Sequence, residues 1–350
     1  MTQERSTGEL EKEIVELIRT KGPITFFEFM DIALYHPLHG FYSSPRRGPG
    51  IDYRTSPTLT PAFGTLLVGA FDQMKGALGT DFLNVVEIGG GTGQLAEVVL
   101  ESRKDFRWTF VERFATNEHA QRRAVWGGRG CSWAKDLSEV EPFVGCMLAN
   151  EVLDNFPVHV FEKSGTPLEV FVEVENDRLV ESLREPSSAE LMAWAERVAA
   201  PLVEGQRFEL RPGIQRFAEQ ASEGLLRGYV LVLDYGDEAP ALQLENPEGT
   251  VVTYRNEILG ADPLDSSGHA DITAHVDFTQ LRNELERRGF EQISVATQRE
   301  FLRTLGIEDL EISIEKQRRA ASSEGRHADF VSLTAEKGRL HALRSGGSLG

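Results

Sequence analysis

The stretch from Val85 to Leu95 constrains the fold more than any other part of the chain. It begins with an apolar, β-branched run that is typical of a buried parallel strand. Three glycines at alternate positions then interrupt the run: Gly89, Gly91 and Gly93. Helical spacing resumes directly after them. A strand, a glycine turn and a helix in this order are typical of the nucleotide-binding corner of a doubly wound sheet, where a ligand approaches the main chain and the N–H groups of the helix start.

The spacing of the glycines discriminates between ligands. A dinucleotide fingerprint reads G-x-G-x-x-G/A and would need Gly or Ala at position 94, where this chain has Gln94. Glu87 lies two residues before the first glycine, and the resulting form E-x-G-x-G-x-G resembles motif I of class I S-adenosylmethionine (SAM) methyltransferases. NAD or another nucleotide, and a glycine turn without any ligand, remain as alternatives.

Length and composition limit the classes of protein. A chain of 350 residues can bury a large core, as one elaborated domain or as two. Its 26% charged and 40% hydrophobic residues are ordinary for a globular protein. The net charge of −18 argues against nucleic acid as the main partner, because the phosphate backbone would be repelled. The charge would tolerate a cationic protein or peptide.

The chain has no apolar run of the length that a membrane span needs. Its first residues have no apolar signal-peptide core and are too acidic for a transit peptide, so we expect a cytoplasmic location. Cys131 and Cys146 fall in expected core strands and are interpreted as buried free thiols. No Cys, His or Asp spacing predicts a disulfide framework or a metal site.

The hydrophobic pattern predicts an α/β protein with a Rossmann-like, doubly wound and mostly parallel sheet. We expect an N-terminal helical region over residues 1–80 and a nucleotide-binding core formed by residues 81–156 and 211–335. Residues 157–210 change to an antiparallel pattern and are predicted to be an inserted lid that covers the site. Residues 336–350 are expected to be a flexible tail.

Two acidic residues follow the next predicted strands of the core. Glu112 ends the second strand and lies 19 residues after Gly93, close to the spacing of about 20 expected for an acid that binds ribose hydroxyls. Asp136 follows the third strand and is a candidate for the adenine side of the site, although a helix cap is an equal alternative.

The fourth strand ends at a polar cluster that includes Asn150, Glu151 and Asp154. Ligands of open α/β sheets bind beyond the carboxyl ends of the strands, so Glu151 and Asp154 are expected beside a methyl acceptor. Two carboxylates suit a guanidinium group, because each accepts paired N–H bonds and together they hold positive charge on two of its nitrogens. The alternative is that both acids cap a helix or bind backbone N–H groups.

Three candidates lie further along the chain. Asp234 and Tyr235 end the fifth predicted strand, where Asp234 could contact substrate or anchor a loop. His275 lies in a polar run before a helix, where it could be a general base or a buried, hydrogen-bonded histidine.

Several segments, taken together and in order, resemble the mitochondrial complex I assembly-factor arginine methyltransferases and their bacterial MidA-like relatives. The matching pieces span residues 20–335 and are Gly22–Thr25 with Phe29-Met30, Tyr35–Pro37 with Gly40–Tyr42, Asp52-Tyr53 with Thr55-Ser56-Pro57, Phe63-Gly64, Val86–Gly89 with Gly91 and Gly93, Asn150-Glu151 with Asp154, Pro157–His159, Asp234–Gly236, Gly249-Thr250 with Tyr254-Arg255, Asp271–Phe278, and Phe301-Leu302 with Leu305–Ile307.

The resemblance implies a SAM-dependent fold with a helical N-terminal region and an inserted lid, and methylation of arginine in a protein. It assigns Gly89, Gly91, Gly93 and Glu112 to SAM, and Asn150, Glu151 and Asp154 to the acceptor. Ser56, in one of the matching pieces, becomes a further substrate-side candidate.

The chain departs from the family pattern at several positions: Gly90, Thr92, Thr58, Val152-Leu153, Asn155 and Asn256. These departures do not affect the assignment of the cofactor. They weaken the inference that this chain shares the substrate of the family.

The sequence therefore predicts a SAM-dependent methyltransferase whose acceptor is arginine in a protein segment, with a homodimer permitted. Two alternatives stay open: a SAM-binding assembly factor without catalysis, and a small-molecule methyltransferase whose lid closes over a metabolite. A nicotinamide enzyme is disfavoured by Gln94.

Overall fold

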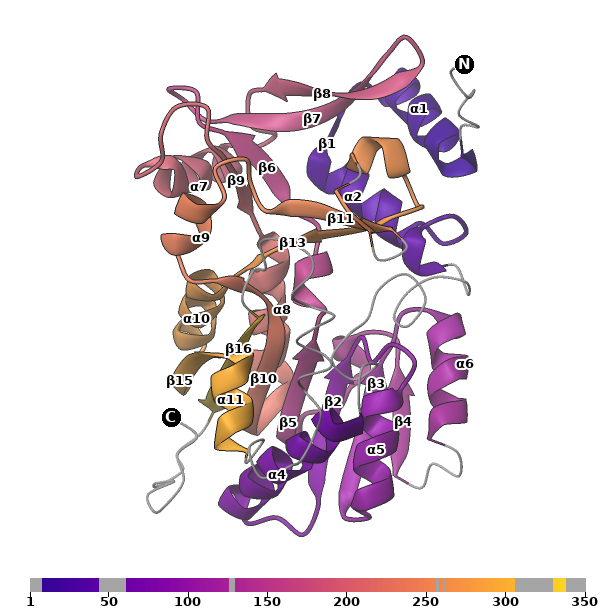
Figure 1. Ribbon diagram of the computed structural model, residues 1–350, viewed down its shortest axis with the longest axis vertical. Helices are drawn as coiled ribbons and strands as arrows, with labels where there is room; N and C mark the ends of the chain where they lie inside the picture. Colours follow the sequence, from indigo (N-terminus) through magenta and orange to yellow (C-terminus); the bar gives the residue numbers. More distant parts are fainter. Residues whose placement is uncertain are drawn as a thin grey trace. The chain divides into compact units, whose positions relative to one another are not determined.

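The computed structural model of the chain describes residues 8–43, 61–125, 130–255, 258–260, 262–305 and 330–337. The chain divides into two compact units, between which it passes several times (Figure 1). Unit 1 comprises residues 1–53, 155–213 and 239–275, and unit 2 comprises residues 54–154, 214–238 and 276–350.

Unit 2 is built on one large sheet. Its strands are β2 (Leu83–Ile88), β3 (Phe106–Val111), β4 (Cys131–Ala134), β5 (Phe143–Asn150), β10 (Leu225–Asp237), β14 (Val276–Asp277), β15 (Phe290–Thr297) and β16 (Phe330–Lys337). The order is β15-β16-β10-β5-β2-β3-β4, and β14 pairs with β10. The neighbouring strands from β10 to β4 are parallel, whereas β16 runs antiparallel to both of its neighbours. The predicted mostly parallel α/β sheet is confirmed.

Helices cover this sheet. They are α4 (Pro61–Leu78), α5 (Gln94–Ser102), α6 (Ala115–Ala124), α8 (Pro212–Gly224, which begins in unit 1), α10 (Phe278–Arg287) and α11 (Gln298–Thr304), with short 3₁₀ turns η2 (Leu137–Glu139) and η3 (Leu153–Asn155). Figure 1 shows α4, α5 and α11 on the near face of the sheet. Their apolar residues form one buried core with alternate sheet residues such as Trp108 and Leu231.

The strand order reverses between β2 and β5, because β2 leads to β3 and β4 on one side and β5 leads to β10 on the other. In-register pairing brings the last residues of these strands to one edge: Ile88 pairs with Val111 and Ala149, and Leu233 pairs with Asn150. Ligands of open α/β sheets bind at such a switch point, so this edge is where a cofactor is expected.

Unit 1 has two antiparallel sheets of its own. The larger consists of β1 (Ile24–Thr25), β6 (His159–Glu162), β7 (Leu168–Glu175), β8 (Arg178–Arg184) and β9 (Arg207–Leu210), and the smaller of β11 (Val251–Arg255), β12 (Ile258–Leu259) and β13 (Asp271–Ala274). Its helices are α1 (Glu9–Lys21), α2 (Phe26–Tyr35), α7 (Ala189–Ala199), α9 (Ala241–Glu245), and the 3₁₀ turns η1 (Phe41–Ser43) and η4 (Pro263–Ser266). The apolar faces of α1 and α2 pack with β6, β7 and β13 into one core.

Local sequence signals explain where several elements begin. Thr25 and Glu28 form the capping box that starts α2, in which Glu28 N donates to Thr25 Oγ1 at 3.2 Å and Thr25 N donates to Glu28 Oε2 at 2.8 Å. Asp277 caps α10, because its Oδ1 accepts from Gln280 N at 2.9 Å. The antiparallel pattern expected in residues 157–210 is confirmed by the pairing of β6, β7 and β8.

The compact units differ from the predicted division of the chain. Residues 1–53 do not stand apart as a helical region, because β1 pairs with β7 and joins them to the 155–213 segment. Residues 239–275 belong to the same unit, and α4 packs instead on the sheet of unit 2. Strand β16 continues to Lys337, past the expected end of the core at 335, and residues 338–350 lie outside the described part of the chain.

The packing around two glycines predicts opposite effects on stability when each is replaced by alanine. A Cβ on Gly145, in β5, would lie 2.0 Å from the backbone oxygen of Asn84 in β2, so Gly145→Ala must separate two central strands. Gly69, in α4, has nothing within 4 Å of such a Cβ. We expect Gly145→Ala to lower the free energy of unfolding by about 3 kcal/mol or more, and Gly69→Ala to raise it by about 1 kcal/mol. Denaturant unfolding of both variants measures this, and equal effects would contradict the observed register.

Candidate active site at the carboxyl edge of the sheet

The glycine turn joins β2 to α5 in a left-handed backbone conformation. Gly89, Gly91 and Gly93 have φ of 63°, 51° and 84°, values that favour glycine. A Cβ on Gly93 would lie 3.0 Å from the Cα of Gln121 in α6. The glycines are therefore required by the chain's own conformation and packing, in addition to the predicted approach of a ligand. Gly93 is the N-cap of α5, so no N-cap side chain competes for the first N–H groups of that helix.

Glu87 lies beneath this turn as a buried carboxyl group. The indole of Trp108 donates to Glu87 Oε2 at 2.9 Å. Burial, with a smaller contribution from the charge of Glu112, raises the pKa of Glu87 to about 7, against the lowering effect of the Trp108 bond. A Cβ on Gly90 would lie 2.6 Å from Glu87 Oε2, so glycine at this departure from the family pattern matches the position of the carboxyl group.

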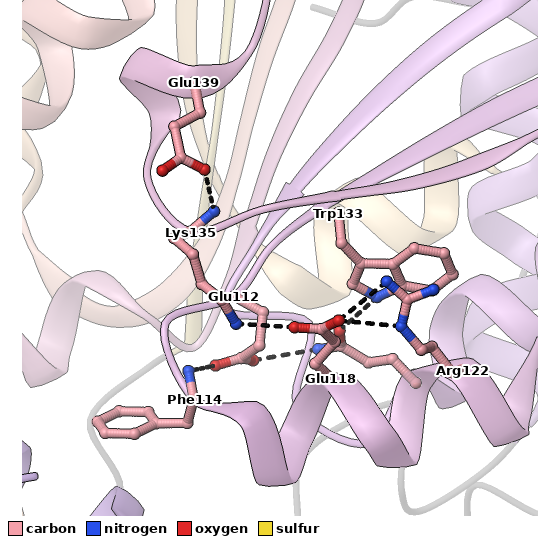
Figure 2. A network of polar contacts seen from close by, with 8 residues as sticks. Glu112, Phe114, Glu118, Arg122, Trp133, Lys135 and Glu139 are labelled. Carbon is pink, nitrogen blue, oxygen red and sulfur yellow. Dashed lines mark hydrogen bonds and ion pairs between the residues drawn. The ribbon is translucent and has the colours of Figure 1, made fainter.

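Glu112 follows β3 and is buried beside the same turn. Its Oε1 accepts from Phe114 N at 2.9 Å (Figure 2). Its Oε2 accepts from Gln121 Nε2 at 3.1 Å. Burial raises the pKa of Glu112, and the hydrogen bonds from Phe114, Asn117 and Gln121 oppose that shift. Gln121 also donates to Gly91 O at 3.1 Å. This glutamine was not predicted, because nothing in the pattern of α6 distinguishes it from an ordinary buried helix residue.

Asp136 has the alternative role that the sequence left open. It caps η2, since its Oδ1 accepts from Ser138 N at 3.0 Å and from Ser138 Oγ at 2.8 Å. These bonds lower the pKa of Asp136. Gln220 Nε2 donates to the same oxygen at 3.2 Å. Asp136 lies after β4, at the expected edge of the sheet. Its Oδ1 already accepts hydrogen bonds from Ser138 and Gln220.

Strand β5 ends at Asn150, so Asn150 and Glu151 lie at the same edge of the sheet. Asn150 Nδ2 lies 3.4 Å from Glu151 Oε1. Within the described part of the chain, the buried Oδ1 of Asn150 has no hydrogen-bond donor. Glu151 adopts φ of 52°, a left-handed conformation uncommon for glutamate, and its N–H donates to Leu233 O at 2.8 Å. Such local strain persists only where the surrounding structure holds it.

Asp234 supplies that support from β10, directly after the last residue of that strand that pairs with β5. Its fully buried carboxylate accepts from Val152 N at 3.1 Å and Leu153 N at 2.9 Å through Oδ2, and from Tyr235 N at 2.9 Å through Oδ1. Burial raises the pKa of Asp234 to about 6, and the backbone N–H groups oppose the shift. The geometry favours the loop-anchoring alternative for Asp234, and Tyr235 contributes its backbone N–H to the anchor.

The loop that Asp234 anchors packs directly on the glycine turn. A Cβ on Gly89 would lie 2.9 Å from Val152 Cγ2, so Val152 occupies the space beside the turn. Asp154, at the end of the same loop, is buried. The structure thus places the glycine turn and the loop of the predicted acceptor residues at one edge of the sheet of unit 2.

Other predicted residues belong to unit 1 or fall outside the described part of the chain. His275 is in unit 1, where its carbonyl accepts from Arg211 Nε at 2.7 Å. Asn155, another departure from the family pattern, is also in unit 1 and donates through Nδ2 to Asp271 Oδ1 at 2.9 Å. Ser56 lies outside the described residues, as do the departures Thr58 and Asn256.

The described residues contain no group of three or more His, Cys, Asp or Glu side chains that could hold a metal ion. Among the helices of those same residues, none has the length and apolar character needed to span a bilayer.

Comparison with known families agrees with this geometry. Residues 64–295 match the family described as "Putative S-adenosyl-L-methionine-dependent methyltransferase". Because the match covers more than half of the chain, the chain belongs to this family of SAM-dependent methyltransferases. The predicted class of enzyme and the predicted cofactor are thereby confirmed.

Individual relatives match over most of their length. The chain is 28% identical over 346 residues to the rat mitochondrial protein arginine methyltransferase NDUFAF7, covering 85% of this chain and 74% of that protein. It is 26% identical over 338 residues to the Caenorhabditis elegans homolog, covering 86% and 77%. A crystal structure from Burkholderia thailandensis with bound S-adenosyl-homocysteine has a TM-score of 0.82 and 25% identity, over 95% of this chain and 92% of that one. The predicted resemblance is confirmed.

The expected cytoplasmic location is contradicted by these relatives. The proteins from rat, human and Caenorhabditis elegans are all named as mitochondrial. The expectation rested on the acidic composition of the first residues of the chain. Location is set by targeting signals, which the fold and the site do not reveal.

The raised pKa of Glu87 predicts a pH-dependent stability. Because the folded-state pKa of about 7 exceeds the ordinary 4.5, the buried acid favours the folded state at low pH, and this contribution is lost as the pH rises from about 4.5 to 7. We expect wild type to lose about 3 kcal/mol relative to Glu87→Gln between pH 5 and pH 8. Denaturant unfolding of both proteins at several pH values tests this; parallel pH curves would show that Glu87 is ionised throughout.

Proposed function

We propose that this chain transfers a methyl group from SAM to a guanidinium nitrogen of arginine in a protein substrate. The observation that carries the proposal is the edge formed by Asn150, Glu151 and Asp154, which lies against the glycine turn through Val152. The names of the relatives, protein arginine methyltransferases, support the same acceptor.

The donors and acceptors at this edge suit a guanidinium group. Arginine presents five N–H donors and no acceptor, and it is not deprotonated in solution at neutral pH. The buried Oδ1 of Asn150 and the carboxylate of Glu151 are acceptors on neighbouring residues. A site lined with hydrogen-bond acceptors binds a planar array of N–H groups. It offers no complementary contacts to a bulky apolar methyl acceptor.

The residues would act by positioning and by holding charge. When bound, SAM supplies a methyl group made electrophilic by a positively charged sulfur. Glu151 and Asp154 would hold the positive charge of the guanidinium on two nitrogens, so that the third keeps the electron pair that forms the new bond to carbon. As the new bond forms, the bond between the methyl carbon and sulfur would break and release S-adenosylhomocysteine, and the proton on that nitrogen would pass to bulk water during or after attack. Positioning and fixed charges of this kind account for much of the rate enhancement in many enzymes.

The cofactor side of the proposal assigns the glycine turn to the amino-acid part of SAM and Glu112 to the ribose. Glu112 presents a nearly buried carboxylate next to Gly91, with its orientation set by Phe114 and Gln121. A carboxylate has about four acceptor positions, so these bonds leave capacity for a hydroxyl donor. Asp136 stays a candidate for the adenine side, and a homodimer stays a prediction from the sequence.

The test measures turnover and cofactor affinity separately in the same variant. We expect Glu151→Gln to lower methyl transfer at least about a hundredfold, because it removes the charge that orients the guanidinium, while the affinity for S-adenosylhomocysteine changes by less than about threefold. Glu101→Gln, an exposed carboxylate of α5, is the matched control and should change neither quantity. The assay follows methyl-labelled SAM into a protein extract, with methylarginine identified after hydrolysis.

Each other outcome identifies a different function. Label recovered only in small molecules would mean a small-molecule methyltransferase. A folded protein that binds S-adenosylhomocysteine and transfers no label would mean a SAM-binding assembly factor. Equal loss of turnover and cofactor affinity in Glu151→Gln would make Glu151 a structural anchor.

A further inference from the structure

Gln121 links three segments of chain that end at the edge of the sheet. Its side chain is fully buried on α6. Nε2 donates to Gly91 O in the glycine turn and to Glu112 Oε2 after β3, each at 3.1 Å. Oε1 accepts from the indole Nε1 of Trp133 in β4, also at 3.1 Å. One amide therefore connects the turn that follows β2 with the residue that follows β3 and with a side chain of β4.

The chemistry of these contacts requires a primary amide. The two N–H groups of Nε2 donate to two acceptors, one of which is the carboxylate of Glu112. The amide oxygen Oε1 accepts from the indole of Trp133. A carboxylate at this position would face Glu112 without a proton to donate. An apolar side chain of the same size would leave the buried acceptors unsatisfied, which is costly where water is excluded.

Trp133 determines which way the amide points. Its ring stacks on Phe110 with centroids 5.4 Å apart and planes at 16°, and the guanidinium of Arg122 lies 3.9 Å above the ring. Figure 2 shows Trp133 beside Arg122, next to the separate outer contacts of Glu118 with Arg122 and Lys135. Because the indole can only donate, it holds the amide oxygen toward itself and turns the NH₂ group toward Glu112 and Gly91.

Helix α6 also lies directly against the turn, since Gly93 leaves only 3.0 Å between an added Cβ and the Cα of Gln121. The main chain of the turn and the carboxylate of Glu112 are thus held to one point of α6. A shift of this amide would change the position of both groups together.

We propose that Gln121 is a positioning residue for the cofactor: it orients the carboxylate of Glu112 toward the ribose hydroxyls and fixes the glycine turn relative to it. The proposal rests on the assignment of Glu112 to the ribose under the proposed function. It does not depend on the identity of the methyl acceptor.

The experiment compares two ligands by calorimetric titration: S-adenosylhomocysteine and its 2′-deoxyribose analogue. The ratio of their affinities reports the contact with the ribose hydroxyl. In Gln121→Met we expect the affinity for S-adenosylhomocysteine to fall about tenfold and the ratio to collapse toward one, because a released carboxylate no longer meets the hydroxyl. Arg123→Gln, on the exposed side of α6, is the control and should leave both affinities unchanged.

The competing outcomes overturn the proposal in distinct ways. If Gln121→Met keeps both affinities at their wild-type values, Gln121 does not orient Glu112. An equal fold loss for both ligands, which leaves the ratio at its wild-type value, would reveal a merely structural residue. Glu112→Gln in the same assay separates the two assignments, because an unchanged ratio there refutes the ribose assignment itself. If Gln121→Met does not fold, Trp133→Phe decides: it keeps the ring and removes only the indole N–H, and a wild-type ratio in that variant overturns the proposal.

Discussion

The parallel pairing of β5 between β2 and β10 is the constraint on which the site depends. Main chains approach closely there: a Cβ on Gly145 would lie 2.0 Å from Asn84 O, and one on Gly228 would lie 1.8 Å from Gly145 O. With these strands in register, the glycine turn and the Asn150–Asp154 loop leave the sheet side by side at the point where the strand order reverses. Changing the register would move the two halves of the site apart.

Buried hydrogen bonds hold the residues at this edge of the sheet in defined positions. Asp234 binds the backbone of the loop after Glu151, and Gln121 binds the glycine turn and Glu112. Neither group is exposed. Under the proposed function, their role is to fix the groups assigned to the ligands, because a buried polar group with all its partners in place has few alternative positions.

The sequence predicted what is encoded locally. The glycine turn, the parallel strands and the caps at Thr25 and Asp277 follow from short-range patterns, and the structure has them. Contacts between distant segments were not predictable in this way. The two-residue strand β1 pairs with a strand almost 150 residues further on, and no local pattern specifies that partner or the resulting unit. Gln121 was missed for a related reason, since its importance lies in three partners from separate segments: Gly91 in the glycine turn, Glu112 after β3 and Trp133 in β4. Asp234 was predicted to end its strand, but β10 continues to Asp237. Only its hydrogen bonds favoured an anchoring role over substrate contact.

The most direct test of the account is calorimetric titration of the folded protein with S-adenosylhomocysteine, with NAD as the control ligand and Gly91→Val as the control variant. We expect saturable binding of S-adenosylhomocysteine at roughly micromolar affinity or tighter, no binding of NAD, and loss of binding in Gly91→Val, where φ is 51° and a β-branched residue cannot adopt the turn. A folded wild-type protein that ignores S-adenosylhomocysteine, or that prefers NAD, would contradict the assignment of this edge as a SAM site.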